Sequence, residues 1–214
     1  YHAITSFELW AKYCPNIRKK TMKTGIFGGS FDPVHNGHIK TALFCKKAFR
    51  LDQVMFLPLG DAPHKNKVAP KQMRLKMLQA ALEGIEDCSV SRIELDREGK
   101  TYTYDTVKWL QKHTEGKYFY IIGADTVNTM HTWYRAQEVF SMIEFIVAGR
   151  TGVDITQGIA RVQAMGAKLH FADFVGPDIS STAIKQRIRQ GLRIDAMVPP
   201  GVLEMIKKYE LYQD

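Results

Sequence analysis

The chain has few cysteines and no long apolar run, and each shortage excludes a class of protein. Only three cysteines occur among 214 residues, and Cys14, Cys45 and Cys88 form no CxxC pair. This spacing provides neither a disulfide framework nor a cysteine zinc site, and it fits a reducing cytoplasm. No stretch approaches the roughly 18 consecutive apolar residues that span a membrane. We therefore expect a soluble, cytoplasmic protein.

The first residues also lack the features of an export signal. Their basic cluster, Arg18 to Lys20, stands at the wrong end, and the uninterrupted apolar run of roughly 7–15 residues is missing. Met22 leads directly into a strand-like run. We expect residues 1–21 to be an N-terminal extension of uncertain origin and residues 22–214 to form a single domain.

The charge balance is basic without being concentrated. Lysines and arginines number 30 against 22 acidic residues, giving a net charge of +8. Such an excess suits a nucleotide, a nucleic acid or an anionic membrane, and charge alone does not choose among them. Because the basic residues are dispersed and no helix-turn-helix or aromatic-basic strand motif is present, we expect neither a nucleic-acid nor a membrane partner.

Strand-like and helical segments alternate along the chain. Short apolar runs predict strands at 23–27, 53–58, 89–95, 118–122, 143–148 and 168–171. Helical spacing predicts helices at 36–49, from about 70, and at 104–113, 154–165 and 181–190. This alternation favours an α/β fold with a single doubly wound, mostly parallel sheet, whose ligands sit beyond the carboxyl ends of the strands.

The loop after the first predicted strand, GGSFDPVHNGH at 28–38, concentrates polar chemistry. Gly28 and Gly29 let the backbone approach a ligand, and the following helix start offers amide groups and a positive dipole end to phosphate. If that helix begins near residue 33 or 34, His35 and His38 lie on one face and converge on the same group. Half of a metal site and a purely structural loop are the alternatives.

This loop resembles the signature of the HxGH nucleotidyltransferase superfamily, which implies a Rossmann-like nucleotidyltransferase fold. The resemblance makes His35 and His38 the catalytic residues, which bind the phosphates of ATP and stabilise charge at the α-phosphate without a covalent intermediate. It also implies that residues of the glycine turn bind ATP, namely Gly28, Gly29, Ser30 and Phe31.

A second segment, ISSTAIKQRI at 179–188, resembles the ISSTxxR element of the same superfamily. Ser180, Ser181 and Thr182 can cap a helix and present hydroxyl and amide groups to the triphosphate, although an ordinary N-cap explains them as well. Lys185 stands where the family usually has arginine. It keeps the positive charge but not the bidentate fork, and we expect it at the β- and γ-phosphates.

Three further segments resemble the bacterial nicotinate mononucleotide adenylyltransferases: LPLGDAPHK at 57–65, TYTYDT at 101–106 and IIGADTVNTMHTWY at 121–134. The resemblance implies that Trp133, with Tyr134, stacks on the pyridine ring and that Thr103 helps to hold the nicotinate. Lys65 is a candidate for the acceptor's phosphate or carboxylate. A core role for Trp133 and a solvated charge at Lys65 are the alternatives.

The third of these segments also carries Gly123 and Asp125 at a strand end. The resemblance places them among the ATP-binding residues, near the adenosine ribose. A helix N-cap is the alternative role for Asp125, and the two roles are compatible.

The reaction implied by the resemblance joins ATP and nicotinate mononucleotide, giving nicotinate adenine dinucleotide and pyrophosphate, a step of NAD biosynthesis. Magnesium is expected on ATP, with no metal ligands from the protein. The alternatives are nicotinamide mononucleotide, phosphopantetheine or another phosphate acceptor, a domain that binds nucleotide or nucleic acid without catalysis, and a dinucleotide sensor. The sequence leaves the oligomeric state open.

Overall fold

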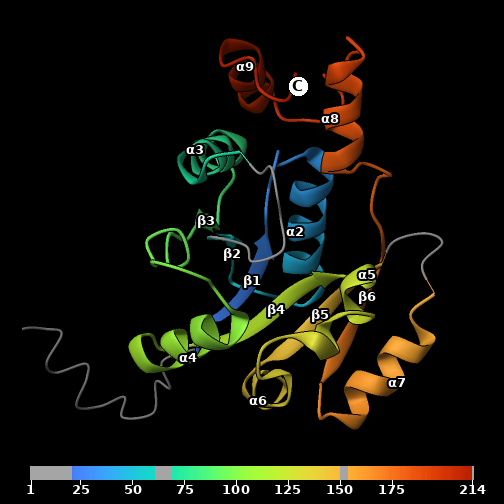
Figure 1. Cartoon of the computed structure of the whole chain (residues 1–214). Helices are drawn as coiled ribbons and strands as arrows, with labels where there is room; N and C mark the ends of the chain where they lie inside the picture. The colour runs from blue at the N-terminus through green and yellow to red at the C-terminus, as the bar shows by residue number, and fades with distance from the viewer. Residues whose placement is uncertain (1–20, 61–68, 150–153, 214) are drawn as a thin grey trace, which may run out of the picture.

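A computed structural model of the chain describes residues 21–60, 69–149 and 154–213 (Figure 1). Its centre is a six-stranded sheet in the order β3-β2-β1-β4-β5-β6, and all five strand pairings are parallel. The strands are β1 Lys23–Gly29, β2 Gln53–Pro58, β3 Cys88–Val90, β4 Lys117–Gly123, β5 Glu144–Gly149 and β6 Leu169–Val175. The predicted α/β class and doubly wound parallel sheet are confirmed.

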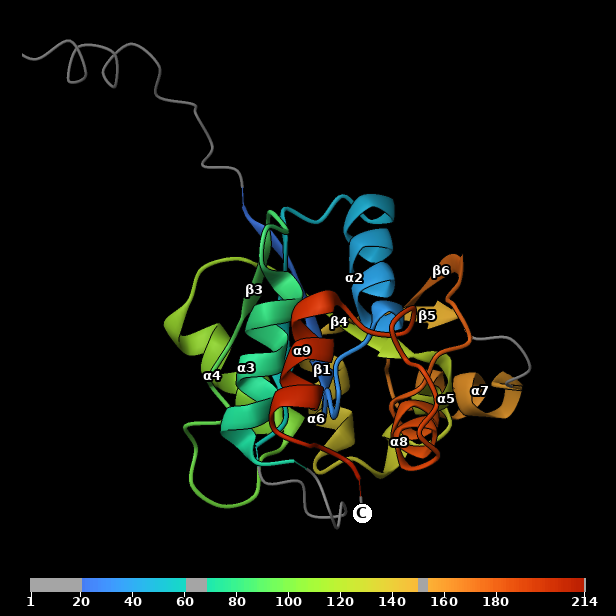
Figure 2. The ribbon, with the colours of Figure 1, turned by 90° about the horizontal axis from the view of Figure 1, so that it is seen from above.

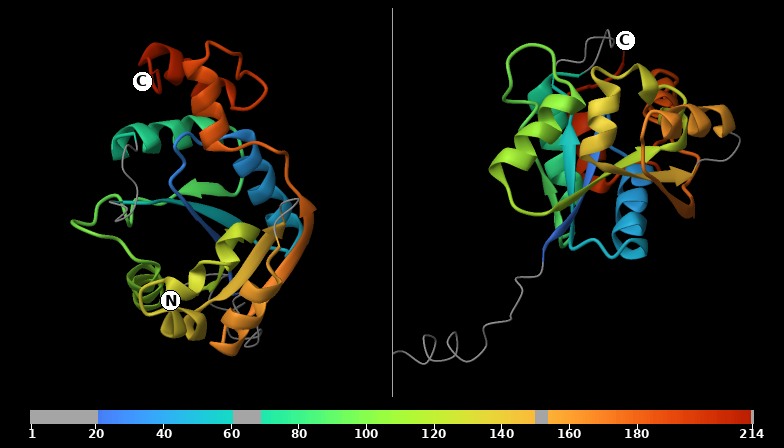
Figure 3. Two further views of the ribbon diagram at one scale, coloured as in Figure 1. Left: turned by 45° about the vertical axis from the view of Figure 1, so that its right-hand side comes forward. Right: turned by 90° about the horizontal axis from the view of Figure 1, so that it is seen from below.

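Helices cover both faces of this twisted sheet (Figures 1 and 3). One core lies on the side of α2 Asn36–Ala48, α3 Lys71–Leu82, α8 Ser181–Arg189 and α9 Pro200–Lys208. The other lies beneath α4 Thr103–His113, α5 Ala124–Val127, the 3-10 turn η1 Met130–Thr132, α6 Ala136–Met142 and α7 Thr156–Ala164. Figure 2 shows α3 and α9 side by side, where Gly201 approaches Ala80.

The strands are apolar on both faces because each face is covered. Ile26 and Phe145 point into the second core, whereas their neighbours Phe27 and Ile146 point into the first. Successive side chains of a strand alternate between the two faces, so a parallel sheet buried on both sides needs continuous apolar runs. This requirement explains why the strands were recognisable in the sequence.

Several predicted boundaries were wrong. The strand expected at 89–95 ends at Val90, because the chain then turns, with the amide of Ile93 donating to Ser91 Oγ at 3.3 Å. The last strand is longer than predicted and reaches Val175, which pairs with Gly149 across an irregular register. The short helices α5 and α6 and the helix α9 were not predicted.

The strand order brings β1 and β4 together, although they are separated in sequence by two strands and three helices. The helices α2 and α3, which connect β1, β2 and β3, lie on one face of the sheet. The helices that connect β4, β5 and β6 lie on the opposite face. A crevice therefore opens beyond the carboxyl ends of β1 and β4, which is where open α/β sheets bind ligands. Among the described residues, no helix has the length and apolarity needed to cross a membrane.

Candidate active site

A cleft of about 360 Å³ occupies this crevice, between the carboxyl ends of β1, β4 and β5 and the start of α8. Most of the residues predicted to bind ATP or to act in catalysis line it. They are Gly28, Gly29, Ser30, His35, His38, Gly123, Asp125, Ser180 and Ser181. The fold thus brings together two motifs that stand about 150 positions apart in the sequence.

The two histidines belong to the start of α2, although not in the way that the sequence suggested. The helix begins at Asn36 rather than near residue 33 or 34, and His35 is its N-cap with extended backbone angles. His35 Nδ1 accepts from the amide of His38 at 3.3 Å, and His38 Nδ1 accepts from the amide of His35 at 3.2 Å. The two rings stack with their centroids 3.6 Å apart.

This reciprocal capping fixes the tautomer of both rings. A neutral imidazole that accepts a hydrogen bond at Nδ1 carries its proton on Nε2. Each ring therefore has an Nε2–H group, the donor that a phosphoryl oxygen requires. Gly37 is needed between them, because a Cβ there would lie 2.9 Å from His35 Nδ1.

A second helix start faces the same cleft. Ser180 is the N-cap of α8 and its hydroxyl accepts from the amide of Ala183 at 3.1 Å. Ser181 Oγ donates to the carbonyl oxygen of Pro33 at 2.9 Å, which joins α8 to the loop before α2. In Figure 1 the first turns of α2 and α8 adjoin. Two helix N-termini that converge on one cleft favour an anionic ligand.

Three residues predicted to bind ATP do not line the cleft. Phe31 is 1% exposed and belongs to the first core. Thr182 is exposed in the first turn of α8. Lys185 forms an ion pair with Asp32 and lies 4.9 Å from the ring centroid of Tyr212. Their contacts with ATP stay predictions.

Asp32 connects distant parts of the chain. Its side chain is 4% exposed, and besides Lys185 it binds two further donors. Oδ1 accepts from the Tyr212 hydroxyl at 2.7 Å and from the amide of Ala69 at 3.1 Å. The buried carboxylate is thus supplied with a cation and two hydrogen bonds, as a buried charge requires. Burial and the charge of Asp32 raise the pKa of the Tyr212 phenol, so this hydroxyl stays a donor.

Sequence reasoning missed Arg74, which is 2% exposed. Its guanidinium donates to the carbonyl oxygens of Ser30 at 2.9 Å, Leu59 at 2.7 Å and Ala69 at 3.1 Å. It therefore links the loop at residues 28–38, called the glycine loop below, to the segment after β2. The available signal was its position four residues before Leu78, which places it on the buried face of α3.

The residues predicted to bind the acceptor gather beside the cleft rather than in its lining. Thr103 is the first residue of α4 and hydrogen-bonds Tyr120. Trp133 packs edge-on against Tyr120 with their centroids 6.0 Å apart, so the core alternative holds for part of its surface. Tyr134 is 51% exposed. Lys65 lies outside the described residues.

The N-cap role considered for Asp125 is wrong, because Gly123 is the N-cap of α5. Asp125 stands in the first turn of that helix, exposed at the cleft. A Cβ at Gly123 would lie 2.7 Å from Asp125 Oδ1, so the glycine leaves room for the carboxylate. The contact of Asp125 with the adenosine ribose stays a prediction.

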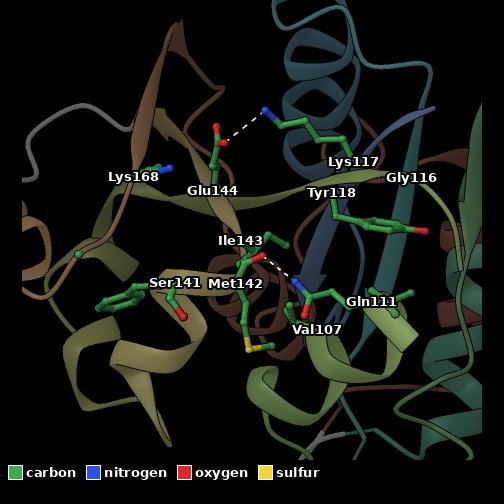
Figure 4. A pocket seen from close by; sticks show the side chains of 13 residues that line it. Val107, Gln111, Gly116, Lys117, Tyr118, Ser141, Met142, Ile143, Glu144 and Lys168 are labelled. Atoms are coloured by element: carbon green, nitrogen blue, oxygen red, sulfur yellow. Dashed lines mark hydrogen bonds and ion pairs between the residues drawn. The ribbon is translucent and has the colours of Figure 1, made fainter. Parts of the chain in front are cut away.

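A second cavity, of about 310 Å³, lies at the opposite end of the sheet (Figure 4). It opens at the amino ends of β4 and β5, where Lys117 pairs with Glu144 at 3.2 Å, and Gln111 donates to the carbonyl oxygen of Met142 at 3.0 Å. None of the residues predicted to act in binding or catalysis lines it. The cleft at the carboxyl ends is therefore the candidate active site.

Comparison with known proteins agrees with this location. A model of the cytidylyltransferase-like family matches residues 26–187. The chain belongs to the cytidylyltransferase-like family. Two curated relatives are named as probable nicotinate-nucleotide adenylyltransferases. One, from Bacillus pumilus, is 39% identical over 89% of this chain and 98% of the relative. The other, from Streptococcus pneumoniae, is 37% identical over 92% and 93%. The predicted nucleotidyltransferase identity is confirmed.

Solved structures show the same fold. The nicotinic acid mononucleotide adenylyltransferase of Plasmodium falciparum, complexed with NaAD, matches with a TM-score of 0.75 at 18% identity, covering 89% of this chain and 97% of the other. The same enzyme complexed with APC gives a TM-score of 0.73. The likeness extends over almost the whole sheet and its helices.

Proposed function

We propose that this nucleotidyltransferase transfers the adenylyl group of ATP to nicotinate mononucleotide, releasing pyrophosphate and forming nicotinate adenine dinucleotide. The observation that carries the proposal is the stacked histidine pair at the start of α2, whose Nε2–H groups belong to the same cleft as the start of α8. The names of the curated relatives support the choice of acceptor.

The chemistry requires positioning and charge stabilisation rather than proton removal. An oxygen of the acceptor phosphate forms a bond to the α-phosphorus of ATP, and the bond from that phosphorus to the bridging oxygen breaks, so pyrophosphate leaves. The acceptor phosphate is already anionic at neutral pH, and no general base is needed. Donors from His35 and His38 to the phosphate oxygens stabilise the charge of the transition state.

The triphosphate fits the remaining features of the cleft. The backbone of Gly28 and Gly29 and the N-termini of α2 and α8 provide amide groups for its oxygens. Asp125, in the first turn of α5, would accept a hydrogen bond from a ribose hydroxyl. Trp133 and Thr103 both contact Tyr120, and there the acceptor's pyridine ring would be held by stacking and by a hydroxyl donor.

We propose that magnesium enters with ATP. Among the described residues, no group of three or more histidines, cysteines, aspartates and glutamates is placed to hold a metal ion. Magnesium binds phosphate oxygens readily and keeps several of its waters, so no cage of protein carboxylates is needed to hold it. The ion supplies charge neutralisation on the phosphates. The cytoplasmic location expected from the cysteines stays a prediction.

Pyrophosphate release tests the proposal. The purified protein is mixed with ATP and magnesium, with nicotinate mononucleotide, with nicotinamide mononucleotide or with no acceptor. We expect release that requires an acceptor and is faster with the acid. A strong preference for the amide would overturn the acceptor assignment, and no release with either would overturn the activity.

A further inference from the structure

Glu94 is a buried carboxyl group close to the candidate site but outside the cleft. It lies in the turn after β3 and its side chain is 1% exposed. Oε1 accepts from Thr106 Oγ1 at 2.8 Å. Burial raises the pKa of this carboxyl, while Thr106, the charge of Arg97, Thr101 and the amide of Gly60 offset the rise in part.

The partners of Glu94 belong to the segment that the sequence relates to the acceptor. Thr101 and Thr106 are the first and last residues of the stretch 101–106, and both face the carboxyl group. Oε2 and Thr101 Oγ1 are both buried, and neither has a hydrogen-bond partner among the described residues. Two buried polar atoms beside each other, without other partners, are most simply satisfied by one shared proton.

From this segment, a short series of contacts leads both to Gly28 at the cleft and to Trp133 beside it. Thr103, in the middle of the stretch, hydrogen-bonds Tyr120. The Tyr120 hydroxyl lies so close to β1 that a Cβ at Gly28 would be 2.1 Å away from it. The ring of Tyr120 packs against Trp133. A displacement of the stretch 101–106 would therefore move Thr103 and Tyr120 directly.

We infer that Glu94 is a positioning residue for the acceptor, which holds the stretch 101–106 through its hydrogen bond to Thr106 and through a proton shared between its second oxygen and Thr101, and thereby places Thr103 and Tyr120. The inference rests on the proposed function. Hydrogen bonding rather than charge is the active property, because the acceptor carries a phosphate and a pyridine carboxylate. An ionised carboxylate in a buried place nearby would repel that anion, whereas a protonated one acts as both donor and acceptor.

Steady-state kinetics of three variants test this role. Glu94→Ala removes the carboxyl group that faces Thr106 and Thr101, and we expect the KM for nicotinate mononucleotide to rise about tenfold or more, as for unpaired buried partners, with the KM for ATP changed less than about threefold. Glu94→Gln keeps an acceptor for Thr106 and a donor for Thr101, so we expect both constants to stay near those of the wild type. Thr106→Val removes the bond to Glu94 and the one that Thr106 Oγ1 accepts from Arg97 at 3.3 Å, but it leaves Glu94 and Thr101 in place, so it should give a smaller rise in the same constant.

Exposed Glu98, four residues further along the same connection, provides the matched control, and Glu98→Ala should change neither constant. If Glu94→Ala raises the two KM values equally, or if Glu94→Gln is as impaired as Glu94→Ala, the inference is overturned. Should Glu94→Ala fail to fold, Glu94→Gln and Thr106→Val still decide it. Failure of the proposed function is separate, because the wild-type protein would then not turn over nicotinate mononucleotide.

Discussion

His35 and His38 each accept a hydrogen bond at Nδ1 from the other's backbone amide, so the loop itself orients the two Nε2–H donors. This arrangement was partly predictable. The two residues and their convergence follow from a local motif, whereas the reciprocal capping depends on the helix starting at Asn36. The pairing of Lys185 with Asp32 could not be predicted, because the two residues are 153 positions apart and only the fold brings them together.

His38→Ala should lower kcat by about 10² or more, since it removes a donor that acts on charge in the transition state. Single-turnover measurement with saturating ATP and acceptor gives this rate. His113→Ala, an exposed histidine at the end of α4, is the control. An unchanged kcat for His38→Ala would contradict the catalytic assignment.

Trp133→Ala should raise the KM for the mononucleotide more than the KM for ATP, because the proposed function has the indole stack on the pyridine ring. Initial rates measured against each substrate separate the two constants. Trp109→Ala, at an indole that is 40% exposed on α4, should leave both unchanged. An equal rise in the two KM values would mean that Trp133 acts only through packing in the core.

The raised pKa of Glu94 predicts that the difference in stability between the wild type and Glu94→Gln depends on pH. The pKa of Glu94 in the folded chain lies above the unfolded value of 4.5 because of burial, with Arg97 opposing the shift and Tyr120 also close to it. Between those two pKa values the folded state binds more protons than the unfolded state, so the unfolding free energy falls as pH rises. The glutamine side chain of Glu94→Gln does not titrate, so the variant does not lose this part of its unfolding free energy as pH rises. Urea unfolding should show the variant gaining stability relative to the wild type from pH 4 to pH 8, and a constant difference would contradict the raised pKa.

At the scale of elements, the sequence predicted the long helices and the buried strands well, because their periodicity extends over many residues. It made β3 too long, since that strand has only 3 residues, and it missed α5, which has 4. Elements of that length show no period and are formed by tertiary contacts. The start of α8 was predictable, since Ser180 is a favoured N-cap followed by apolar residues at helical spacing.

Ser180→Ala should lower the unfolding free energy by about 0.5–2 kcal/mol, the usual cost of losing an N-cap hydrogen bond. The lost bond is the one to the amide of Ala183. Thr182→Ala, at an exposed residue two positions on, should change stability by less than about 0.5 kcal/mol. Chemical denaturation of both variants makes the comparison, and equal losses would show that the cap contributes nothing of its own.

Across the whole molecule, the alternation of strands and helices was enough to predict the class of the sheet and the end at which the candidate site lies. The contacts that complete the site were not predictable, because Arg74, Asp32 and Tyr212 are brought together by packing between α3, the glycine loop and the segment after α9. A buried charge network of this kind leaves no short pattern in the sequence.

Tyr212→Phe should cost about 1.5–3 kcal/mol of unfolding free energy, the range for hydrogen bonds to charged groups, since it leaves Asp32 with one donor fewer. The ring over Lys185 is kept, so packing changes little. Tyr209→Phe, at a side chain that is 43% exposed, is the matched control. Thermal unfolding should separate the two variants, and equal melting temperatures would mean that the hydroxyl contributes nothing.

The bond between Asp32 and Tyr212 joins residues 180 positions apart, which has a consequence for the order of events during synthesis. While the chain is being translated, the glycine loop emerges early, but its buried carboxylate has no cation until residue 185 has left the ribosome and no phenol until residue 212 has followed. Until then Asp32 is a charge that favours water over the interior. The nucleotide site is thus among the last parts of the molecule to mature, although its signature is among the first to be made.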